Sequence, residues 1–265
     1  MPELPEVITI KDQLNNTIKG KTIAEISTTL KIKQVDINNS SKIMYRRITA
    51  VDHVGKTIQI KTDTKFSILI HLGMTGRLLF NTTDQYEKVK FIFQDNSYLV
   101  FSDIRKFGYF KIIEEDEVAI SKTKIGPSAL TINLINFRTQ ILQRKTDIKT
   151  LILNQHIISG LGNIYATDAL FLAKINPLQT AKTLNPNQIT KLLDAIQEIL
   201  KEGIKNKGIS MNRYVDIYGQ KGSQQNFFRV YKKANQPCIR CNTIIQTTKQ
   251  KGRTTYFCPE CQKIT

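Results

Sequence analysis

The sequence has no long apolar run, and acidic residues are scarce relative to basic ones. No segment reaches the roughly 18–20 apolar residues that a helix needs to cross a bilayer, and the acidic first residues do not resemble a signal peptide. We therefore expect a cytoplasmic protein without a membrane span. Lysine and arginine number 39 against 22 acidic residues, a net charge of +17. This charge indicates a polyanionic partner, either nucleic acid or an acidic membrane surface.

Histidine and cysteine are also scarce. There are only three histidines, and the four cysteines form two close pairs near the end, Cys238-x-x-Cys241 and Cys258-x-x-Cys261. This spacing suits one tetrahedral Cys₄ zinc site rather than a disulfide framework. Alternating residues on both sides of 249–253 predict a hairpin between the pairs, and so few apolar residues could hardly fold without a metal. We expect one structural zinc with no open coordination position.

Period-two patterns dominate the first half of the chain. The segments rich in Ile, Thr and Val that we expect to be strands are residues 22–30, 42–51, 57–62, 66–70, 88–94, 98–102 and 109–113. Short turns separate them and no helical crossover pattern interrupts them, which predicts a β-sandwich or barrel rather than a parallel α/β sheet. A helix should precede the strands, because Pro5 suits a first turn and Val7, Leu14 and Ile18 form an apolar face.

Helical periodicity begins near residue 130. Asp147 can cap a helix that runs to Ile158, a second helix follows the Gly-rich turn at 160–163, and Pro186 starts a third. Two helices joined by a Gly-x-Gly-Asn turn can hold a phosphate with backbone N–H groups and the Asn163 amide. Residues 208–226 show no convincing period, and we expect a long surface loop there.

The first residues suit nucleophilic chemistry. Removal of Met1 would leave Pro2 as a secondary amine, and α-amino groups have a pKa of roughly 7.7–8.0, so a useful fraction is neutral near neutral pH. The positive end of a helix starting here disfavours protonation of that amine and suits Glu3 and Glu6. A neutral amine beside a carboxyl group suits imine chemistry. The alternative is an ordinary N-terminus.

Three further features are hard to explain as packing. Lys56 follows a glycine at a bend between two predicted strands, and Met74 lies between two glycines. Arg105 and Phe107 lie two residues apart, on one side of an extended segment. A methionine, an arginine and a phenylalanine at loop tips of a basic protein suit a wedge pushed into a base stack. The alternative is that Met74 and Phe107 are core residues and Arg105 is solvated.

Motifs along nearly the whole chain resemble, in matching order, formamidopyrimidine-DNA glycosylase, the bacterial enzyme that repairs oxidised purines. They are Met-Pro-Glu-Leu-Pro-Glu-Val at 1–7, His-Leu-Gly-Met-Thr-Gly at 71–76, Asp-Ile-Arg-Lys-Phe-Gly at 103–108, Gly-Pro at 126–127, Ile-Lys at 148–149, Gly-Leu-Gly-Asn-Ile-Tyr at 160–165 and the cysteine hairpin. The resemblance implies an α+β multidomain fold. Its expected parts are a catalytic β-sandwich with an N-terminal helix (1–129), a helix-two-turn-helix domain with a lesion-capping loop (130–226) and a zinc-finger hairpin (227–265).

The resemblance also implies a bifunctional glycosylase and AP lyase with named catalytic residues. Pro2 would attack C1′ of the damaged nucleotide and form a Schiff base, and Glu3 would be the general acid. Lys56 would serve β-elimination, whereas Arg253 would grip a phosphate and assist δ-elimination.

Seven residues match family positions that contact DNA or fill the gap left by the extruded base: Met74, Tyr86, Arg105, Phe107, Arg144, Lys149 and Asn163. Two positions depart from the family pattern. Tyr86 stands where a histidine that contacts DNA is usual, which puts that contact in doubt, and Asn154 replaces a frequent aspartate.

The expected partner is double-stranded DNA with oxidised bases, bound by a monomer in the bacterial cytoplasm with no membrane contact. Two alternatives remain open. One is an endonuclease VIII-like enzyme that prefers oxidised pyrimidines, although Leu4 and the set Met74, Arg105 and Phe107 favour the purine enzyme. The other is a non-catalytic zinc protein that only binds bent or damaged DNA.

Overall fold

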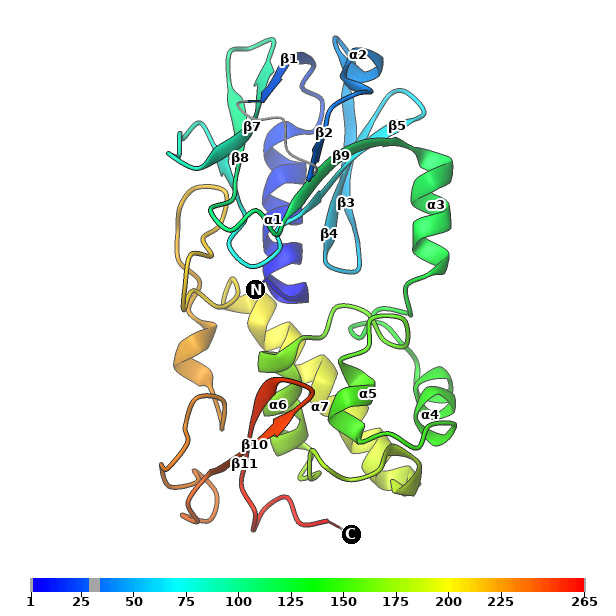
Figure 1. Cartoon of the computed structure of the whole chain (residues 1–265), viewed down its shortest axis with the longest axis vertical. Helices are drawn as coiled ribbons and strands as arrows, with labels where there is room; N and C mark the ends of the chain where they lie inside the picture. Colours follow the sequence, from blue (N-terminus) through cyan, green and yellow to red (C-terminus); the bar gives the residue numbers. More distant parts are fainter. Residues whose placement is uncertain (1, 29–33, 265) are drawn as a thin grey trace. The chain divides into compact units, whose positions relative to one another are not determined.

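The computed structural model describes residues 2–28 and 34–264 and contains two compact units (Figure 1). The first unit joins Met1–Lys124 to Gly203–Gln225, and the second joins Ile125–Glu202 to Asn226–Thr265. These units differ from the expected divisions at 129/130 and 226/227, because residues 203–225 pack within the first unit. The three-part division stays a prediction.

The predicted N-terminal helix is confirmed as α1 (Leu4–Ile18). Glu3 occupies the N-cap position and forms a capping box with Glu6, which satisfies backbone N–H groups that a helix start leaves without partners. The apolar face of α1 is fully buried and packs on strands of the first unit. This packing fixes the position of residues 2 and 3 at the start of the helix.

Two sheets form the rest of the first unit. The four-stranded sheet has the order β1 (Ile23–Thr28), β7 (Glu87–Phe93), β8 (Tyr98–Ser102), β6 (Arg77–Phe80). The five-stranded sheet has the order β2 (Val35–Asp36), β9 (Tyr109–Glu114), β5 (Phe66–His71), β4 (Thr57–Thr62), β3 (Ile48–Val54). Neighbouring strands are antiparallel except β2, which pairs with β9 in parallel.

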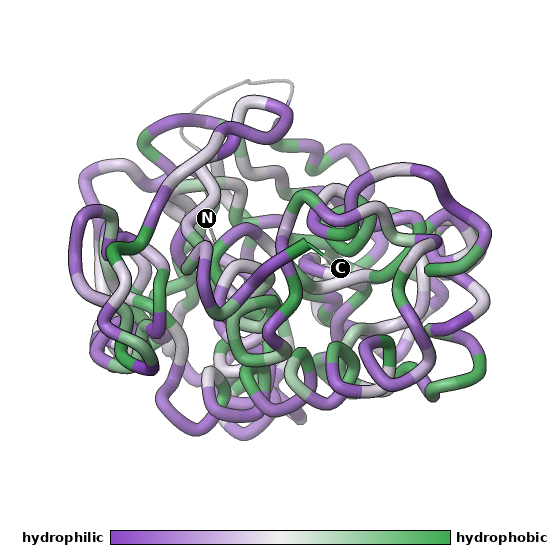
Figure 2. The backbone as a smooth tube through the Cα atoms, turned by 90° about the horizontal axis from the view of Figure 1, so that it is seen from below, coloured by the Kyte–Doolittle hydropathy of each residue, from purple (hydrophilic) through white to green (hydrophobic). Residues whose placement is uncertain are grey.

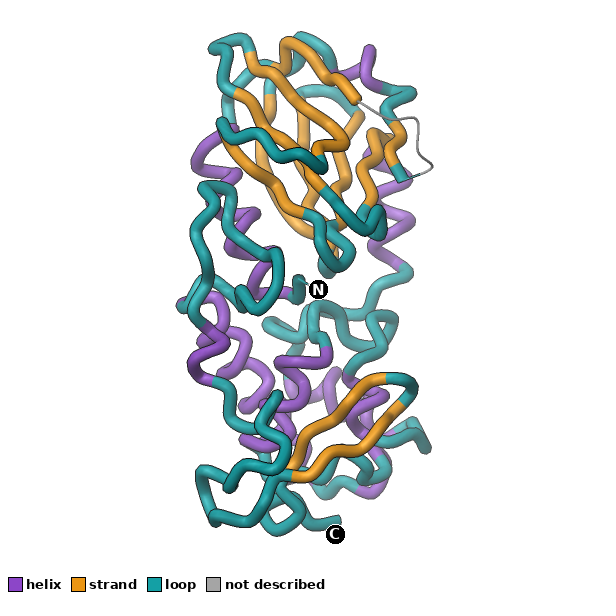
Figure 3. Tube along the Cα trace, turned by 60° about the vertical axis from the view of Figure 1, so that its left-hand side comes forward, coloured by secondary structure: helices purple, strands orange, loops and turns teal. Residues whose placement is uncertain are grey.

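Both sheets and α1 share one apolar core, which confirms the predicted β-sandwich. Phe91 of one sheet and Phe110 of the other meet edge to face, with ring centroids 5.1 Å apart. Figure 3 shows these strands in orange, gathered within the first unit. Interlocked aromatic rings of this kind stabilise a sandwich beyond the area that they bury.

Some predicted element bounds were wrong. The strand expected from residue 42 begins only at Ile48, because α2 (Ser40–Ile43) and the left-handed backbone of Tyr45 (φ 60°) precede it. Neither β6 nor α3 (Glu115–Thr123) was predicted; β6 has only four residues, and α3 buries only Val118. The predicted end of the first strand, residues 29–30, lies outside the described residues.

The second unit holds the three predicted helices, one further helix that precedes them in the chain, and the predicted hairpin. The helices are α4 (Leu134–Leu142), α5 (Ile148–Ile152), α6 (Asn163–Leu172) and most of α7 (Pro186–Lys205), with 3₁₀ turns η1 (Ala181–Thr183) and η2 (Gln224–Phe227) nearby in sequence. Asp147 caps α5 as predicted, by accepting a hydrogen bond from the Thr150 N–H at 2.7 Å. However, α5 does not reach Ile158: the Asn154 side chain accepts from the His156 N–H at 3.0 Å and forms a turn instead.

The hairpin pairs β10 (Gln246–Gln250) with β11 (Arg253–Phe257). The expected connection at 249–253 is shorter than predicted, because Lys251 and Gly252 alone make the turn with φ of 45° and 77°. Positive φ at both central residues is the conformation of a type I′ turn, which matches the twist of the two strands. The ladder therefore extends to Arg253.

The prediction of a surface loop at 208–226 is wrong for much of its length. Tyr214 and Ile217 join the core of the first unit, and Asp216 is buried. Asp216 accepts a hydrogen bond from the Gln13 side chain of α1 at 2.8 Å, and Ile217 O accepts from the Phe80 N–H at 2.8 Å. These long-range contacts fix a segment whose own sequence has no period.

Within the described residues, no helix is both long and apolar enough to cross a membrane. Figure 2 accordingly shows polar and apolar residues mixed along the trace.

Candidate functional site

A buried carboxylate organises the start of α1. The Glu3 N–H donates to Glu6 Oε2 at 2.7 Å, and the Ile209 N–H donates to Glu6 Oε1 at 2.8 Å. A Cβ on Gly208 would lie 2.7 Å from Glu6 Cγ, so only glycine allows this approach. Glu6 thus ties Pro2 and Glu3, both buried, to residues 203–225. The sequence offered only a helix-dipole role for Glu6, because its second partner is remote in the chain.

Lys56 lies in the turn between β3 and β4, after Gly55 with φ 56°. Burial lowers the pKa of His71, and the positive charge of Lys56 lowers it further. The ring of His71 stacks on Tyr109 with centroids 5.4 Å apart, and its Nδ1 accepts from the Gly73 N–H at 3.0 Å. A neutral His71 therefore anchors the segment that leads to Met74.

Two neighbouring segments, residues 71–76 and 103–108, carry the three predicted wedge residues, and we call them the wedge loops. Met74 is 41% exposed and Phe107 is 56% exposed, so the alternative that they are core residues is wrong. The Arg105 guanidinium lies over the Phe107 ring, 4.6 Å from its centroid. The side chains have the exposure that a wedge requires.

Asp103 joins the two wedge loops. Its buried carboxylate accepts from Thr75 Oγ1 at 2.6 Å, from the Arg105 N–H at 3.3 Å and from the Gly108 N–H at 2.8 Å. The loop backbones also touch, because a Cβ on Gly73 would lie 2.5 Å from Gly108 N. Asp103 is the first residue of the motif Asp-Ile-Arg-Lys-Phe-Gly at 103–108, but only the structure reveals its role in holding Arg105 and Met74 in place.

Tyr86 lies in the connection between β6 and β7, where it is half-buried. The Arg213 guanidinium covers its ring, 4.9 Å from the centroid. Tyr86, which departs from the family pattern, therefore stacks with the Arg213 guanidinium within the first unit.

A polar network in the second unit brings Lys149 and Asn163 together. The buried Lys149 Nζ donates to Asn163 Oδ1 at 2.7 Å and to Thr255 Oγ1 at 2.6 Å, and Asn163 Nδ2 donates to Thr254 O at 3.1 Å. Lys149 thus joins α5, α6 and β11.

The two predicted arginines of the second unit are placed differently. Arg144 is half-buried after α4, where its Nη1 donates to Gln140 O at 3.1 Å. Arg253 is exposed at the start of β11. The structure therefore leaves Arg253 accessible and places Arg144 partly against its own helix.

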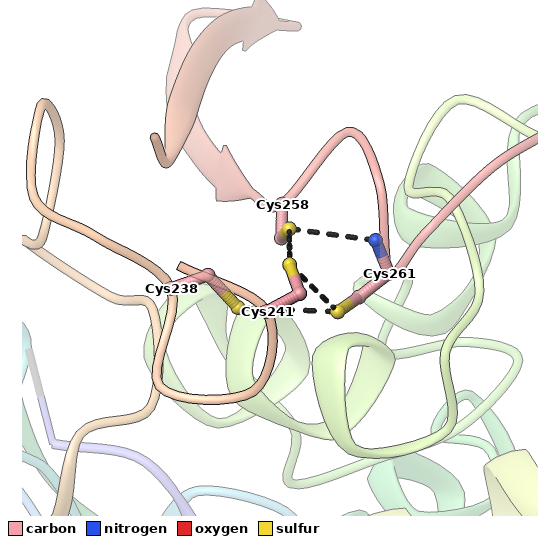
Figure 4. A group of neighbouring side chains, drawn as sticks. All are labelled: Cys238, Cys241, Cys258 and Cys261. Carbon is pink, nitrogen blue, oxygen red and sulfur yellow. Dashed lines mark hydrogen bonds between the residues drawn. The ribbon is translucent and has the colours of Figure 1, made fainter. Parts of the chain in front are cut away.

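The four cysteines converge as predicted (Figure 4). Cys238, Cys241, Cys258 and Cys261 place their sulfur atoms within 4.8 Å of one another. Burial and the neighbouring thiols raise the pKa of Cys261 to about 12, whereas hydrogen bonds from Thr243 lower the pKa of Cys241 to about 6. Four thiols this close together ionise together only when a cation binds them, and tetrahedral sulfur ligands suit Zn²⁺.

Family models match most of the chain. The formamidopyrimidine-DNA glycosylase N-terminal domain matches residues 1–110, the H2TH domain of the same enzyme matches 125–214, and the zinc finger found in FPG and IleRS matches 235–264. The chain belongs to the formamidopyrimidine-DNA glycosylase family.

Individual relatives of the family are similar over their full length. The formamidopyrimidine-DNA glycosylase of Chloroflexus aurantiacus is 37% identical over 271 residues, which cover 99% of this chain and 98% of the relative. A complex between a Lactococcus lactis FPG mutant and DNA containing Fapy-dG matches with a TM-score of 0.91 and 33% identity, covering 99% of this chain and 100% of that chain. A complex of the wild-type Lactococcus lactis enzyme with DNA containing an oxidised pyrimidine has a TM-score of 0.90, 33% identity and the same coverage.

Membership of the formamidopyrimidine-DNA glycosylase family confirms four predictions. The fold is the predicted one, and the chain is an enzyme, a DNA-repair glycosylase that binds DNA. The zinc-finger match and the clustered cysteines identify a structural zinc site formed by Cys238, Cys241, Cys258 and Cys261. The family favours this enzyme over the non-catalytic zinc protein.

Proposed function

We propose that this enzyme excises oxidised purines, including 8-oxoguanine and formamidopyrimidines, from duplex DNA and then cleaves the strand as an AP lyase. The observation that carries the proposal is the start of α1, where Pro2 precedes the buried pair Glu3 and Glu6. The Fapy-dG in the DNA of the Lactococcus lactis complex supports the choice of purine lesions.

The proposed reaction needs only groups of this chain and the DNA. After loss of Met1, the Pro2 nitrogen attacks C1′ of the damaged nucleotide, and the glycosidic bond breaks with its electron pair leaving on the base, which takes up the proton that the nitrogen loses. Glu3 donates a proton to the sugar ring oxygen as the C1′–O4′ bond opens, which leaves an iminium linkage between Pro2 and C1′. Lys56 then serves β-elimination of the 3′ phosphate, and Arg253 holds a phosphate for δ-elimination.

The proposed DNA contacts follow from the need to extrude the damaged nucleotide, since C1′ is shielded in the duplex. Met74, Arg105 and Phe107 fill the gap that it leaves, and their exposure supports this role. In the second unit we assign phosphate contacts to Asn163 and Arg144. Lys149 holds the Asn163 amide in the free enzyme, which supports a role for both residues, and Tyr86 remains a predicted contact.

Borohydride reduction tests the chemistry, because it converts the iminium linkage into a stable bond between enzyme and DNA. Mature protein, shown by intact mass to lack Met1, should be trapped on a duplex with 8-oxoguanine opposite cytosine. Acetylation of the terminal nitrogen should abolish the adduct and strand cleavage together. Pro5→Ala is the matched control, since it changes a proline in the first turn of α1 and leaves the amine intact. Cleavage that survives acetylation would refute the role of Pro2.

A second substrate class has one specific observation in its favour. The Lactococcus lactis enzyme also forms a complex with DNA containing an oxidised pyrimidine. Single-turnover excision rates on 8-oxoguanine and on thymine glycol separate the two classes. We expect the purine to react faster, and a faster reaction with thymine glycol would reverse the assignment.

We further propose that the enzyme acts as a monomer in the bacterial cytoplasm. The sequence contains no heptad pattern that would favour association. Sedimentation of the free protein should give a single species of about 30.3 kDa.

A further inference from the structure

A charged cluster of the first unit holds Arg213. The carboxylate of Asp84 lies 3.0 Å from Arg77 Nη2 and 3.7 Å from Arg213 Nη2. The side chain of Asp84 is only 9% exposed, whereas that of Arg213 is 33% exposed. With Tyr86 covering one face of the Arg213 guanidinium, the ring and the carboxylate together determine where this side chain lies.

The same cluster is connected to the wedge loops. Asp84 Oδ1 accepts from the Tyr86 N–H at 2.8 Å, and Tyr86 O accepts from the Asp103 N–H at 3.1 Å. Asp103 in turn holds Thr75 and Arg105 through its carboxylate. A continuous series of hydrogen bonds thus runs from the support of Arg213 to the residues beside the proposed wedge.

On its other side, Arg213 belongs to a well-anchored part of residues 203–225. Ile209 is bound to Glu6, and Tyr214, directly after Arg213, is buried in the core. Ser210 Oγ donates to Tyr214 O at 2.8 Å and accepts from the Gly222 N–H at 2.9 Å. Arg213 is therefore the charged link between this segment and the connection that carries Asp84 and Tyr86.

The contacts of the Arg213 guanidinium distinguish a role in positioning residues 203–225 from a direct contact with a DNA phosphate. A guanidinium that binds phosphate presents its donors outward in a fork. Here one face lies on Tyr86, Nη2 lies 3.7 Å from Asp84 Oδ2, and the Nε atom is buried without a hydrogen-bond partner among the described residues. One face and Nη2 of the guanidinium therefore contact groups of the first unit, and the buried Nε is not presented to a ligand.

We propose that Arg213 is a positioning residue, which fixes residues 203–225 relative to the wedge loops through Asp84 and Tyr86. This inference rests on the proposed function and on the expectation from the family resemblance that the lesion-capping loop, which we place at residues 208–226, covers the extruded base. Arg213 then sets how well the damaged base is held during excision, a step that an abasic site does not need. Its loss impairs base excision and spares covalent trapping on abasic DNA.

Asp84→Asn and Arg213→Lys test the proposal. Asp84→Asn raises the positive charge of the cluster but removes the carboxylate, and Arg213→Lys keeps the charge but removes the planar guanidinium. An effect of either variant therefore reports on the contacts and not on a loss of positive charge. Each should slow single-turnover excision of 8-oxoguanine about fivefold to tenfold and change borohydride trapping on abasic DNA by less than about twofold. The double variant should be no slower than the slower single variant, because the two residues act as one unit. Hydrogen exchange should become faster at residues 208–217.

Two further variants provide controls. Tyr86→Phe keeps the ring under the guanidinium and should excise faster than Tyr86→Leu. Asp95→Asn removes the ion pair with Lys21, elsewhere in the same unit, and should behave as wild type.

Wild-type excision rates in Asp84→Asn and Arg213→Lys would overturn the role of Arg213, as would equal losses on both DNAs. Tighter DNA binding by Asp84→Asn with unchanged excision would identify a phosphate contact instead. If wild-type protein formed no adduct on either DNA, the proposed function itself would fail, which is a different result.

Discussion

At the scale of single residues, the site depends on buried groups that lie beside the motif residues rather than on the motif residues alone. Glu6 binds the backbone of Glu3 and of Ile209, and Asp103 binds three groups of the wedge loops. A carboxylate that accepts from backbone N–H groups inside a protein forms hydrogen bonds stronger than neutral ones. These two side chains therefore fix the backbone that presents Pro2 and Met74.

We expect Glu6→Gln to destabilise the first unit. The glutamine oxygen can replace one acceptor, but its NH₂ group would face a backbone N–H that needs an acceptor. Loss of one charge-assisted hydrogen bond should lower the free energy of unfolding by about 2 kcal/mol. Urea denaturation measures this change, with Glu25→Gln on the exposed side of β1 as the control. Equal midpoints for the two variants would contradict the role of Glu6.

The lowered pKa of His71 predicts a pH dependence of stability. The unfolded chain takes up a proton near the ordinary value of 6.5, whereas the folded ring does so only at lower pH. The contribution of His71 is therefore complete above pH 6.5 and is lost as the pH falls through the folded pKa.

His71→Asn separates this effect from other titrations, because Asn keeps an acceptor for the Gly73 N–H and does not protonate. The Tm of the wild type relative to this variant should fall between pH 7 and pH 5. Thermal melts at a series of pH values measure it. Parallel curves across this range would contradict the assignment.

At the scale of elements, the sequence predicted most accurately the bounds of those strands and helices that combine a regular apolar pattern with turn or proline residues at their ends. The bounds of β4 and β8 agree with the predicted strands, and α1 begins at its proline-rich start. The missed α3 has little apolar face, since Ile120 is 57% exposed. The pattern of residues 42–47 predicted a strand. Tyr45, however, adopts a left-handed backbone conformation, which the amino-acid composition does not reveal.

The zinc hairpin is an element whose fold should depend on its metal. Cys258 is fully buried, and we expect Cys258→Ser to release zinc and to weaken DNA binding at least about tenfold. Metal analysis and fluorescence anisotropy with a labelled duplex measure the two effects. Thr247→Ala on the exposed side of β10 is the control. Full DNA affinity in zinc-free Cys258→Ser protein would show that the hairpin is dispensable for binding.

At the scale of the whole molecule, the +17 charge predicts DNA affinity that falls steeply with salt. Each neutralised phosphate adds about −0.9 to the slope of log K against log salt concentration. Arg144→Gln should therefore reduce the magnitude of the slope by about one, while Lys65→Gln, in the turn between β4 and β5, should leave it unchanged. Binding titrations at four salt concentrations measure the slopes. The same slope for wild type and Arg144→Gln would remove Arg144 from the phosphate contacts.

The sequence indicated the candidate reactive and DNA-contacting residues more readily than the buried contacts that hold those residues in place. Pro2, Met74 and the four cysteines stand in motifs that indicate their chemistry without a structure. By contrast, the pairs Glu6–Ile209 and Tyr86–Arg213 join residues more than a hundred positions apart. No local period or spacing encodes such a contact, because it depends on how distant elements pack. Sequence therefore predicted the clustering of the cysteines and the exposure of Met74, and it left the internal support of the candidate site to the fold.

The two-piece construction of the first unit has a consequence for synthesis. Lys124 ends its first piece, and the second piece ends about a hundred residues later at Gln225. A ribosome adding roughly 5–20 residues per second needs roughly 5–20 s for that interval. During this time the nascent sandwich lacks Tyr214 and Ile217, so apolar surface that they later cover remains open to chaperones.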